Sequence, residues 1–445
     1  MRTTVLSLLA ALVFSPSIAS ALTVDDAIKQ ALGDHGNIRE RGAREQAKGA
    51  GDTALSVGAR MLFSLHVSDE FQYYNCPFAV SFSPSQAGCL SSIGATPAGG
   101  QPPLVVRNQT TNSFVVSGNQ PLLGLLRLSH DYLAQKRSAK SAAEGVNAND
   151  AKLVENIRNG FLRYFESVAS EDVAKASETE LTEQVRVATS REKVGVITIA
   201  DRLRVQVALA NARQQRVKAH AQAEVARATL LDAIGYDPND ETVTLEEPSQ
   251  LLVEATQPMP ERAAAAQDAI NRRPEVKQAK LTYESAVAAR RSRVFAMLPD
   301  ADLEAAYVRV DGQIFAPKNS YYVGIKAQWA FWEWGSGFFA QRASHHQANA
   351  AAFSLEDQKR QVVLEVKNAF SNLEAASAAV VASKEAIDSA NEAFRVTARS
   401  VEAGTATTTD LLSSQSELTT ARLNLTRSSY EQAMARVTLR RLTGD

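Results

Sequence analysis

Two aspartates, Asp201 and Asp410, lie at matched positions in two copies of one sequence pattern. A carboxylate at the start of a helix can cap that helix, because the helix dipole favours negative charge at its N-terminal end. Both aspartates stand at the beginning of segments rich in helix-forming residues, so this capping role is open to each of them. No Ser/His/Asp, carboxylate-pair or phosphate-loop constellation accompanies them, and an enzyme is therefore the function class that we expect least.

The pattern around these aspartates recurs at a constant offset of 209 residues. Each copy contains a long helix, a Gly-centred turn and a returning helix, so we expect a duplicated architecture of two helical hairpins. Upstream of the hairpins, Gly36 pairs with Pro274 at an offset of 238. The first-copy residues Val187, Gly195, Thr198, Asp201, Leu203, Ala212, Arg213 and Gly235 return as Val396, Gly404, Thr407, Asp410, Leu412, Ala421, Arg422 and Gly444.

Residues 1–21 have the three parts of a secretory signal peptide: Arg2, an apolar run over 5–14, and a small-residue cleavage site at 19–21. We expect the mature chain to begin at Leu22. A retained membrane anchor is the alternative, although the apolar run is shorter than the ~20 residues that span a bilayer. Because no cysteine follows the cleavage point, no N-terminal lipid anchor is expected.

The charge balance is close to zero, with 48 basic and 49 acidic residues, so no nucleic-acid partner is indicated. Beyond the leader, no run of ~18 apolar residues predicts a transmembrane helix. The mature chain is therefore either a soluble exported protein or one that crosses a membrane as strands. Its histidines and cysteines are not spaced as metal ligands, and we expect no metal and no cofactor.

Cys76 and Cys89 both lie in one loop rich in Gly, Ser and Pro, within residues 74–112. Export would place them where disulfides persist, so a disulfide that clips this loop is expected, and two free thiols are the alternative. The loop is much longer than its counterpart in the second copy, and we expect it to face the cell exterior.

Proline positions give the coarse map of the helices, because proline breaks a long helix. Residues 125–193 and 335–402 are rich in Ala, Glu, Lys, Arg and Gln and predict helices of about 100 Å each. Several shorter helices packed in a globule are the alternative. Two short helices stacked end to end would nearly equal one long helix, which favours a tube; these short helices are predicted at 25–58, 200–234, 262–297 and 409–442.

Two strands are predicted in each copy, at about 61–74 and 113–122 and at about 301–311 and 321–332. The first and last alternate apolar and polar residues, as lipid-facing strands do. Four strands cannot close a membrane barrel, since bacterial outer-membrane barrels begin at about eight, so oligomerisation is expected if they cross a membrane.

Aromatic residues near the strand ends suit the two interfacial girdles of a membrane barrel, and the aromatic core of a soluble sheet is the alternative. The members of this group are Tyr73, Tyr74, Trp329, Trp332 and Trp334.

We divide the chain into a signal peptide at 1–21, a first repeat at 22–235, an equatorial linker at 236–261 and a second repeat at 262–445. The linker contains four prolines and a possible short strand at 242–246.

The order, spacing and duplication of these parts resemble the TolC-type outer membrane efflux proteins. The resemblance covers essentially the whole mature chain, and it includes the Ala-Met-Leu-Pro run at 296–299 and the Gly-Thr-x-Thr-x-x-Asp-Leu-Leu segment at 404–412. It implies a mainly α fold with a small β portion. Three chains would form a 12-stranded barrel in outer-membrane lipid, continued by an α-helical barrel through the periplasm. The homotrimer would then be a passive exit duct for a periplasmic adaptor and an inner-membrane pump.

The resemblance also implies roles for residues at the hairpin tips. The turns at Val194, Gly195 and Val196 and at Ala403, Gly404 and Thr405 would meet the adaptor, with a plain turn glycine as the alternative. Asp410 and Asp201 would line the periplasmic aperture, where crowded carboxylates favour cations. Ser413 is assigned to the same aperture, and it stands where some members carry a second acidic residue, so one carboxylate ring and two both stay open.

Two other function classes stay open at this point. A periplasmic adaptor also carries a helical hairpin, but it has one hairpin, not two. A soluble exported coiled-coil scaffold would need no detergent for extraction. The transported substrate cannot be inferred from the residues.

Overall fold

The computed structural model describes residues 21–33, 36–81, 87–92, 102–259 and 261–444. All of the predicted signal peptide except Ala21 lies outside these residues. The chain divides into two compact units. Unit 1 comprises Met1–Arg44, Val146–Pro274 and Lys359–Asp445, and unit 2 comprises Glu45–Gly145 and Glu275–Gln358.

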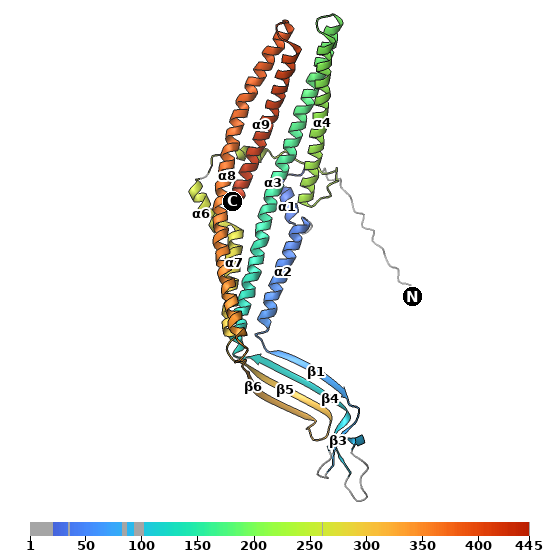
Figure 1. Ribbon diagram of the computed structural model, residues 1–445, viewed down its shortest axis with the longest axis vertical. Coiled ribbons are helices and arrows are strands. Elements are labelled where there is room, and N and C mark those ends of the chain that lie inside the picture. Colours follow the sequence, from blue (N-terminus) through green and yellow to red (C-terminus); the bar gives the residue numbers. More distant parts are fainter. Residues whose placement is uncertain (1–20, 34–35, 82–86, 93–101, 260, 445) are drawn as a thin grey trace, which may run out of the picture. The chain divides into compact units, whose positions relative to one another are not determined.

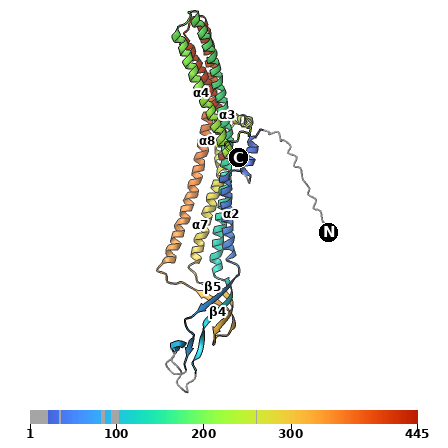
Figure 2. The same cartoon turned by 90° about the vertical axis from the view of Figure 1, so that its right-hand side faces the viewer.

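Two long helices with their returning partners form the helical hairpins. Helix α3 spans Gly124–Lys193 and α8 spans Ser336–Glu402, which confirms the predicted long helices within a residue. Helices α4 (Ile199–Ile234) and α9 (Thr408–Thr443) return along them. In unit 1 the hairpins α3–α4 and α8–α9 lie next to each other and turn at the same end (Figures 1 and 2).

The predictions of single helices over 25–58 and 262–297 were wrong, because each is two helices. Helix α1 (Val24–Leu32) is separated from α2 (Ile38–Ala59), and α6 (Arg262–Arg272) from α7 (Pro274–Phe295). At the first break, a Cβ on Gly36 would lie 2.1 Å from the Ala31 carbonyl oxygen, so the tight turn needs glycine. At the second, Pro274 has no N–H and forces Arg273 into an extended conformation, with ψ 130°.

The linker at 236–261 contains a short helix, α5 (Ser249–Ala255), that was not predicted. The strand predicted at 242–246 is only an isolated parallel bridge between Leu22 and Leu245. In this bridge the Leu22 N–H donates to the Thr244 carbonyl at 2.7 Å, and the Glu246 N–H donates to the Leu22 carbonyl at 3.1 Å. The linker therefore fixes the start of the first repeat at Leu22, but the contact is a single bridge and not a pair of strands.

The core of unit 1 lies where the two short helices α1 and α5 cover the hairpins. One cluster packs Ala27 and Ala31 of α1 against Ile157 and Phe161 of α3 and against α4. A second packs α5 against Leu162 of α3 and against α9. In the second repeat, the residues 209 positions after Leu153, Ile157, Phe161 and Tyr164 form a stripe along α8 that is fully buried. They are Val362, Val366, Phe370 and Leu373.

Unit 2 contains one antiparallel sheet whose main strands follow the order β1-β4-β5-β6 (Figure 1). They span Ser64–Tyr73, Leu104–Pro121, Asp300–Gln313 and Asn319–Gln328. Two short strands, β2 (Phe78–Val80) and β3 (Ala87–Cys89), extend the sheet beside the first part of β4, and a 3₁₀ turn, η1 (Leu90–Ser92), follows them. Above the sheet, α7 packs on α3 through the Ser141 hydroxyl, which donates to the Gln278 carbonyl at 3.1 Å.

The strand boundaries differ from the predicted ones in three places. Residues 61–63 belong to the turn that ends α2, where the Met61 N–H donates to the Gly58 carbonyl. Strand β4 begins at Leu104 instead of 113, because β2 supplies a partner for its first residues. Strand β6 ends at Gln328 instead of 332, because Gln328 pairs with Asp300, the first residue of β5.

We predict that Phe161→Ala and Phe370→Ala each lower the free energy of unfolding by about 3–5 kcal/mol, because each removes a fully buried ring and leaves a cavity. Denaturant unfolding of the detergent-solubilised protein measures this. Lys175→Ala, at an exposed position of α3, is the control and should change little. Unfolding curves that are the same for the Phe variants and the control would contradict the assignment of these rings to the core.

Candidate aperture and docking turns

The turn between α3 and α4 is a hydrogen-bonded glycine turn. Gly195 has φ 75°, the left-handed conformation that glycine adopts at little cost. Its N–H donates to the Glu192 carbonyl at 2.8 Å, and the Val196 N–H donates to the Arg191 carbonyl at 2.9 Å. This pair of bonds is a Schellman motif, which satisfies the last carbonyls of the helix.

The turn between α8 and α9 repeats this geometry. Gly404 has φ 76°, its N–H donates to the Val401 carbonyl at 3.3 Å, and the Thr405 N–H donates to the Ser400 carbonyl at 2.9 Å. No atom lies within 4 Å of a Cβ built on Gly195 or Gly404. The backbone angle, and not lack of space, is therefore what requires glycine at both tips. The predicted turn residues Val194, Val196, Ala403 and Thr405 are all exposed.

Asp201 and Asp410 each complete a capping box at the start of the returning helix. The Thr198 N–H donates to Asp201 Oδ2 at 3.2 Å, and the Asp201 N–H donates to Thr198 Oγ1 at 3.2 Å. At the second tip the corresponding distances between Thr407 and Asp410 are 2.9 and 3.2 Å. The capping role left open by the sequence is thus occupied at both tips.

These hydrogen bonds lower the pKa of both aspartates below the ordinary value. The hydroxyl of Thr198 is the main cause at Asp201 and that of Thr407 at Asp410, followed by the backbone N–H of the same threonine. A lowered pKa means that the folded state favours the charged form. The stabilisation is therefore present above the ordinary pKa of 3.8, and it is lost as the pH falls through the lowered value.

The two tips contact each other through Arg204, which sequence reasoning missed. Arg204 Nη1 lies 3.4 Å from Asp201 Oδ1 and donates to Thr409 Oγ1 at 3.3 Å. Within the first tip, Arg202 Nε pairs with Glu192 Oε2 at 2.6 Å and holds α4 to α3. The only sequence signal for Arg204 was its position three residues after Asp201.

Ser413 lies exposed one turn after Asp410, and its hydroxyl donates to Glu417 Oε1 at 3.3 Å. Residues 410, 413 and 417 follow helical spacing, so they lie on one face of α9. Glu417 is therefore an acidic residue on the aspartate's face, two turns along. From the sequence, only position 413 was considered for a second acidic residue. Glu417 lies seven residues after Asp410, and this helical spacing would have identified it.

Deeper in unit 1, a polar seam joins the two hairpins between α3 and α9. Glu180 accepts hydrogen bonds from Gln415 and from Arg422 Nη1, the latter at 3.0 Å. Gln415 is 2% exposed and its Oε1 accepts from Gln184 Nε2 at 3.3 Å. A buried polar contact of this kind fixes the register of two helices, because an unpaired partner would be costly.

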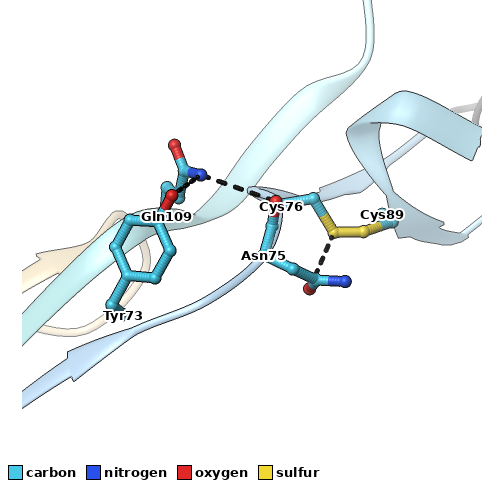
Figure 3. Close-up of a disulfide and its surroundings, with 5 residues drawn as sticks. All are labelled: Tyr73, Asn75, Cys76, Cys89 and Gln109. Atoms are coloured by element: carbon cyan, nitrogen blue, oxygen red, sulfur yellow. Dashed lines mark hydrogen bonds between the residues drawn. A yellow bond between two sulfur atoms is a disulfide. The ribbon is translucent and has the colours of Figure 1, made fainter.

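In unit 2, the structure joins Cys76 to Cys89 in a disulfide, with the two Cα atoms 5.7 Å apart (Figure 3). This separation is typical of disulfides. The bridge connects the end of β1 with β3. Beside it, Gln109 Nε2 donates to the Tyr73 hydroxyl at 2.7 Å, which holds β4 to the same strand end (Figure 3).

The predicted interface aromatics fall into two groups at opposite ends of the sheet. Trp329, Trp332 and Trp334 follow the end of β6, and Trp334 is 87% exposed. Tyr73 is exposed at the other end, beside the loop. Tyr74 differs, because the Arg107 guanidinium lies 3.4 Å from the centre of its ring.

One face of the sheet is apolar and uncovered along its middle. The register places Val67 opposite Val116, Val116 opposite Tyr307, and Tyr307 opposite Tyr321. The other face carries polar groups, such as Glu304, which accepts a hydrogen bond from the Tyr322 hydroxyl at 2.8 Å. The large apolar side chains on the two outer strands are exposed, at Leu65, Val67, Phe71, Tyr73, Tyr321, Val323 and Ile325.

No helix among the described residues is long and apolar enough to cross a membrane. In the same part of the chain, no three His, Cys, Asp or Glu side chains are grouped in a way that could hold a metal ion.

Comparison with known proteins identifies the family. The sequence pattern of the family described as "Outer membrane efflux protein" matches residues 99–236 and 265–445, which is more than half of the chain. One relative is the outer membrane efflux protein BepC of Brucella suis biovar 1 (strain 1330). It is 22% identical over 339 residues, which are 76% of this chain and 73% of BepC.

Solved outer-membrane channels have the same fold. The channel OprN superposes with a TM-score of 0.78 at 18% identity, over 95% of this chain and 89% of OprN. The CmeC channel of Campylobacter jejuni superposes with a TM-score of 0.78 at 11% identity, over 100% of this chain and 94% of CmeC. The chain therefore belongs to the outer membrane efflux protein family, and it is an exit duct of the outer membrane that extends into the periplasm.

Proposed function

We propose that three copies of the chain join their sheets into a 12-stranded barrel in outer-membrane lipid. Strands β1 and β6 are the outer members of the four-stranded order, and each leaves one row of backbone N–H and C=O groups without a partner strand among the described residues. In lipid these groups must be paired, and closure into a ring pairs them all. The uncovered apolar face around Val116 and Tyr307 would face lipid, and the face around Glu304 would face the lumen.

The aromatic groups support this placement, because they lie at the two ends of the sheet. The tryptophans that follow β6 would sit at the periplasmic interface, and Tyr73 at the outer one. The disulfide between Cys76 and Cys89 would then stiffen the loop on the exterior side.

The helices would form the periplasmic tube by the same association. Helix α4 exposes a stripe of Ile199, Leu203 and Val207, and α8 exposes Val381 and Val396. No part of the chain that the structure describes covers either stripe. In a ring of three copies, α4 of one copy would pack beside α8 of the next, which buries both stripes.

At the tips, Asp410 would form a ring of three carboxylates around the axis, with Glu417 two turns deeper and Asp201 beside it. Such rings attract cations and disfavour anions. Crowding of the copies would raise the aspartate pKa values, whereas the capping boxes lower them. We therefore infer that the caps favour the charged form of Asp410 and Asp201 in such an assembly.

The glycine turns would receive a periplasmic adaptor, which couples the duct to an inner-membrane pump. The observation that carries this proposal is the matched geometry of the two tips, with exposed side chains on a backbone that satisfies its own hydrogen bonds. Opening would be iris-like, as the returning helices shift outward. The family match favours this function over a periplasmic adaptor or an exported scaffold.

The first test concerns assembly. Light scattering in detergent should give a protein mass about three times that of one chain, because the free strand edges need partners. A monodisperse monomer that needs no detergent would contradict the barrel.

The second test separates the ring role of Asp410 from its capping role. In planar bilayers, Asp410→Ala should raise conductance and weaken block by divalent cations, because it removes the carboxylate. Thr407→Val is the matched control, since it breaks the same capping box but keeps the carboxylate. If both variants change conductance and block equally, Asp410 acts only as a cap.

The third test concerns the docking turns. Gly404→Leu should abolish export from cells while trimers still form, because a bulky residue at φ 76° strains the turn and obstructs an approaching partner. Gly42→Leu, in the exposed part of α2 with open space around it, is the control. Normal export by the Gly404 variant would remove the docking assignment.

A further inference from the structure

A buried carboxyl group lies at the junction of α1, α2 and α3 in unit 1. Glu40, in the first turn of α2, is 4% exposed, and its Oε1 has no hydrogen-bond partner. It lines a groove of about 1140 Å³ that runs over α3 between α4 and α9. The groove gives water and protons access to a side chain that is otherwise enclosed.

One guanidinium holds the three helices together at this place. Arg44 Nη1 donates at 2.6 Å to the carbonyl of Leu32, which is the last residue of α1. Its Nη2 donates to Asp150 Oδ1 of α3 at 3.2 Å, and its Nε lies 3.5 Å from Glu40 Oε1. We call Glu40, Arg44 and Asp150 the junction cluster.

The junction cluster has two carboxyl groups for one cation. Burial is the main cause that raises the pKa of Glu40, and the neighbouring Asp150 raises it further by a hydrogen bond and by its charge. Arg44 opposes both, and the result is a pKa of about 7. Other charged residues that line the same groove near the cluster are Arg39 on α2, Lys152 on α3 and Asp232 on α4.

The three residues of the junction cluster are not repeated in the second copy. At the offsets that relate the copies, Glu40 corresponds to Gln278, Arg44 to Thr282 and Asp150 to Lys359. Gln278 and Thr282 of α7 contact α3 without any carboxyl group. The Ser141 hydroxyl of α3 donates to the Gln278 carbonyl and lies 2.9 Å from Thr282 Oγ1. Hydroxyl and amide groups do not titrate near neutral pH, so these contacts are a suitable comparison for the junction cluster.

We propose that the junction cluster is a proton-dependent fastener, which holds α1, α2 and α3 together when Glu40 carries a proton and loosens when Glu40 loses it. With the proton, Glu40 can donate to Asp150, and Arg44 balances the one remaining charge. Without it, two carboxylates face each other in an enclosed site, and Arg44 cannot neutralise both.

The direction of the pH effect follows from the raised pKa. The folded junction binds a proton more tightly than a free glutamate of pKa 4.5 does. Its stabilisation is fully present below pH 4.5 and is lost as the pH rises through about 7. The duct would therefore respond to the pH of the periplasm at a place distant in sequence from both hairpin tips.

Hydrogen exchange of the detergent-solubilised protein, read by mass spectrometry between pH 5.5 and 8.5, tests the proposal. After correction for the intrinsic pH dependence of exchange, the amides of residues 38–44 and 146–153 should lose roughly tenfold protection for each pH unit up to about 7, and the loss should level off above that pH. In Glu40→Gln, a neutral side chain of the same size, this loss should be absent. The amides around Ser141 and Gln278 are the internal control and should stay constant.

A second variant keeps the test independent of folding defects. Asp150→Asn removes the charge that helps to raise the pKa of Glu40, so the loss of protection should move to lower pH. His35, which lies outside the described residues, is kept in every variant. Wild-type protein and Glu40→Gln with the same pH profile would overturn the proposal, and so would wild-type protection that does not change with pH.

Discussion

The whole architecture depends on the burial of one narrow apolar stripe on each long helix. A helix of 67 or 70 residues cannot bury itself, and most of the surface of α3 and α8 is polar. At Ile157 and Phe161 in the first repeat, and at Val366 and Phe370 in the second, side chains are fully enclosed. In the first repeat, α1 closes the stripe from one side. Because hydrophobic stabilisation scales with the area removed from water, these layers hold the long hairpins together, along with a smaller buried cluster of Leu181, Leu209 and Ala212.

The sequence predicted the long elements well, because their signals are long. Helices α3 and α8 were located within a residue by the lack of proline and by helix-forming composition. The breaks at Gly33 and at Pro274 were missed, although both residues are known helix breakers. Helix-forming residues such as Ala, Gln, Lys and Arg continue on both sides of each break, so two short helices in series look like one in the sequence.

Contacts between repeats were the part that the sequence could not supply. Arg204 donates a hydrogen bond to Thr409, although the two residues are more than 200 positions apart in the sequence. Gln415 and Glu180 are separated by a similar number of residues, and they too are hydrogen-bonded. Such pairs depend on which faces of the hairpins meet, and no local pattern reports that. The junction cluster was missed for a related reason, because Glu40 and Arg44 look like an ordinary exposed helical pair until Asp150 is placed beside them.

The glycine turns have a consequence for how this duct can diversify. The bonds that shape each turn come mainly from the backbone and from one Thr–Asp capping pair, and at the second tip the Thr405 hydroxyl also donates to the Ser400 carbonyl at 3.1 Å. The apolar side chains at 194, 196 and 403 form none of these bonds. Evolution can therefore exchange them freely and retarget the tips to a new partner, while the loop retains its form and the chain retains its fold.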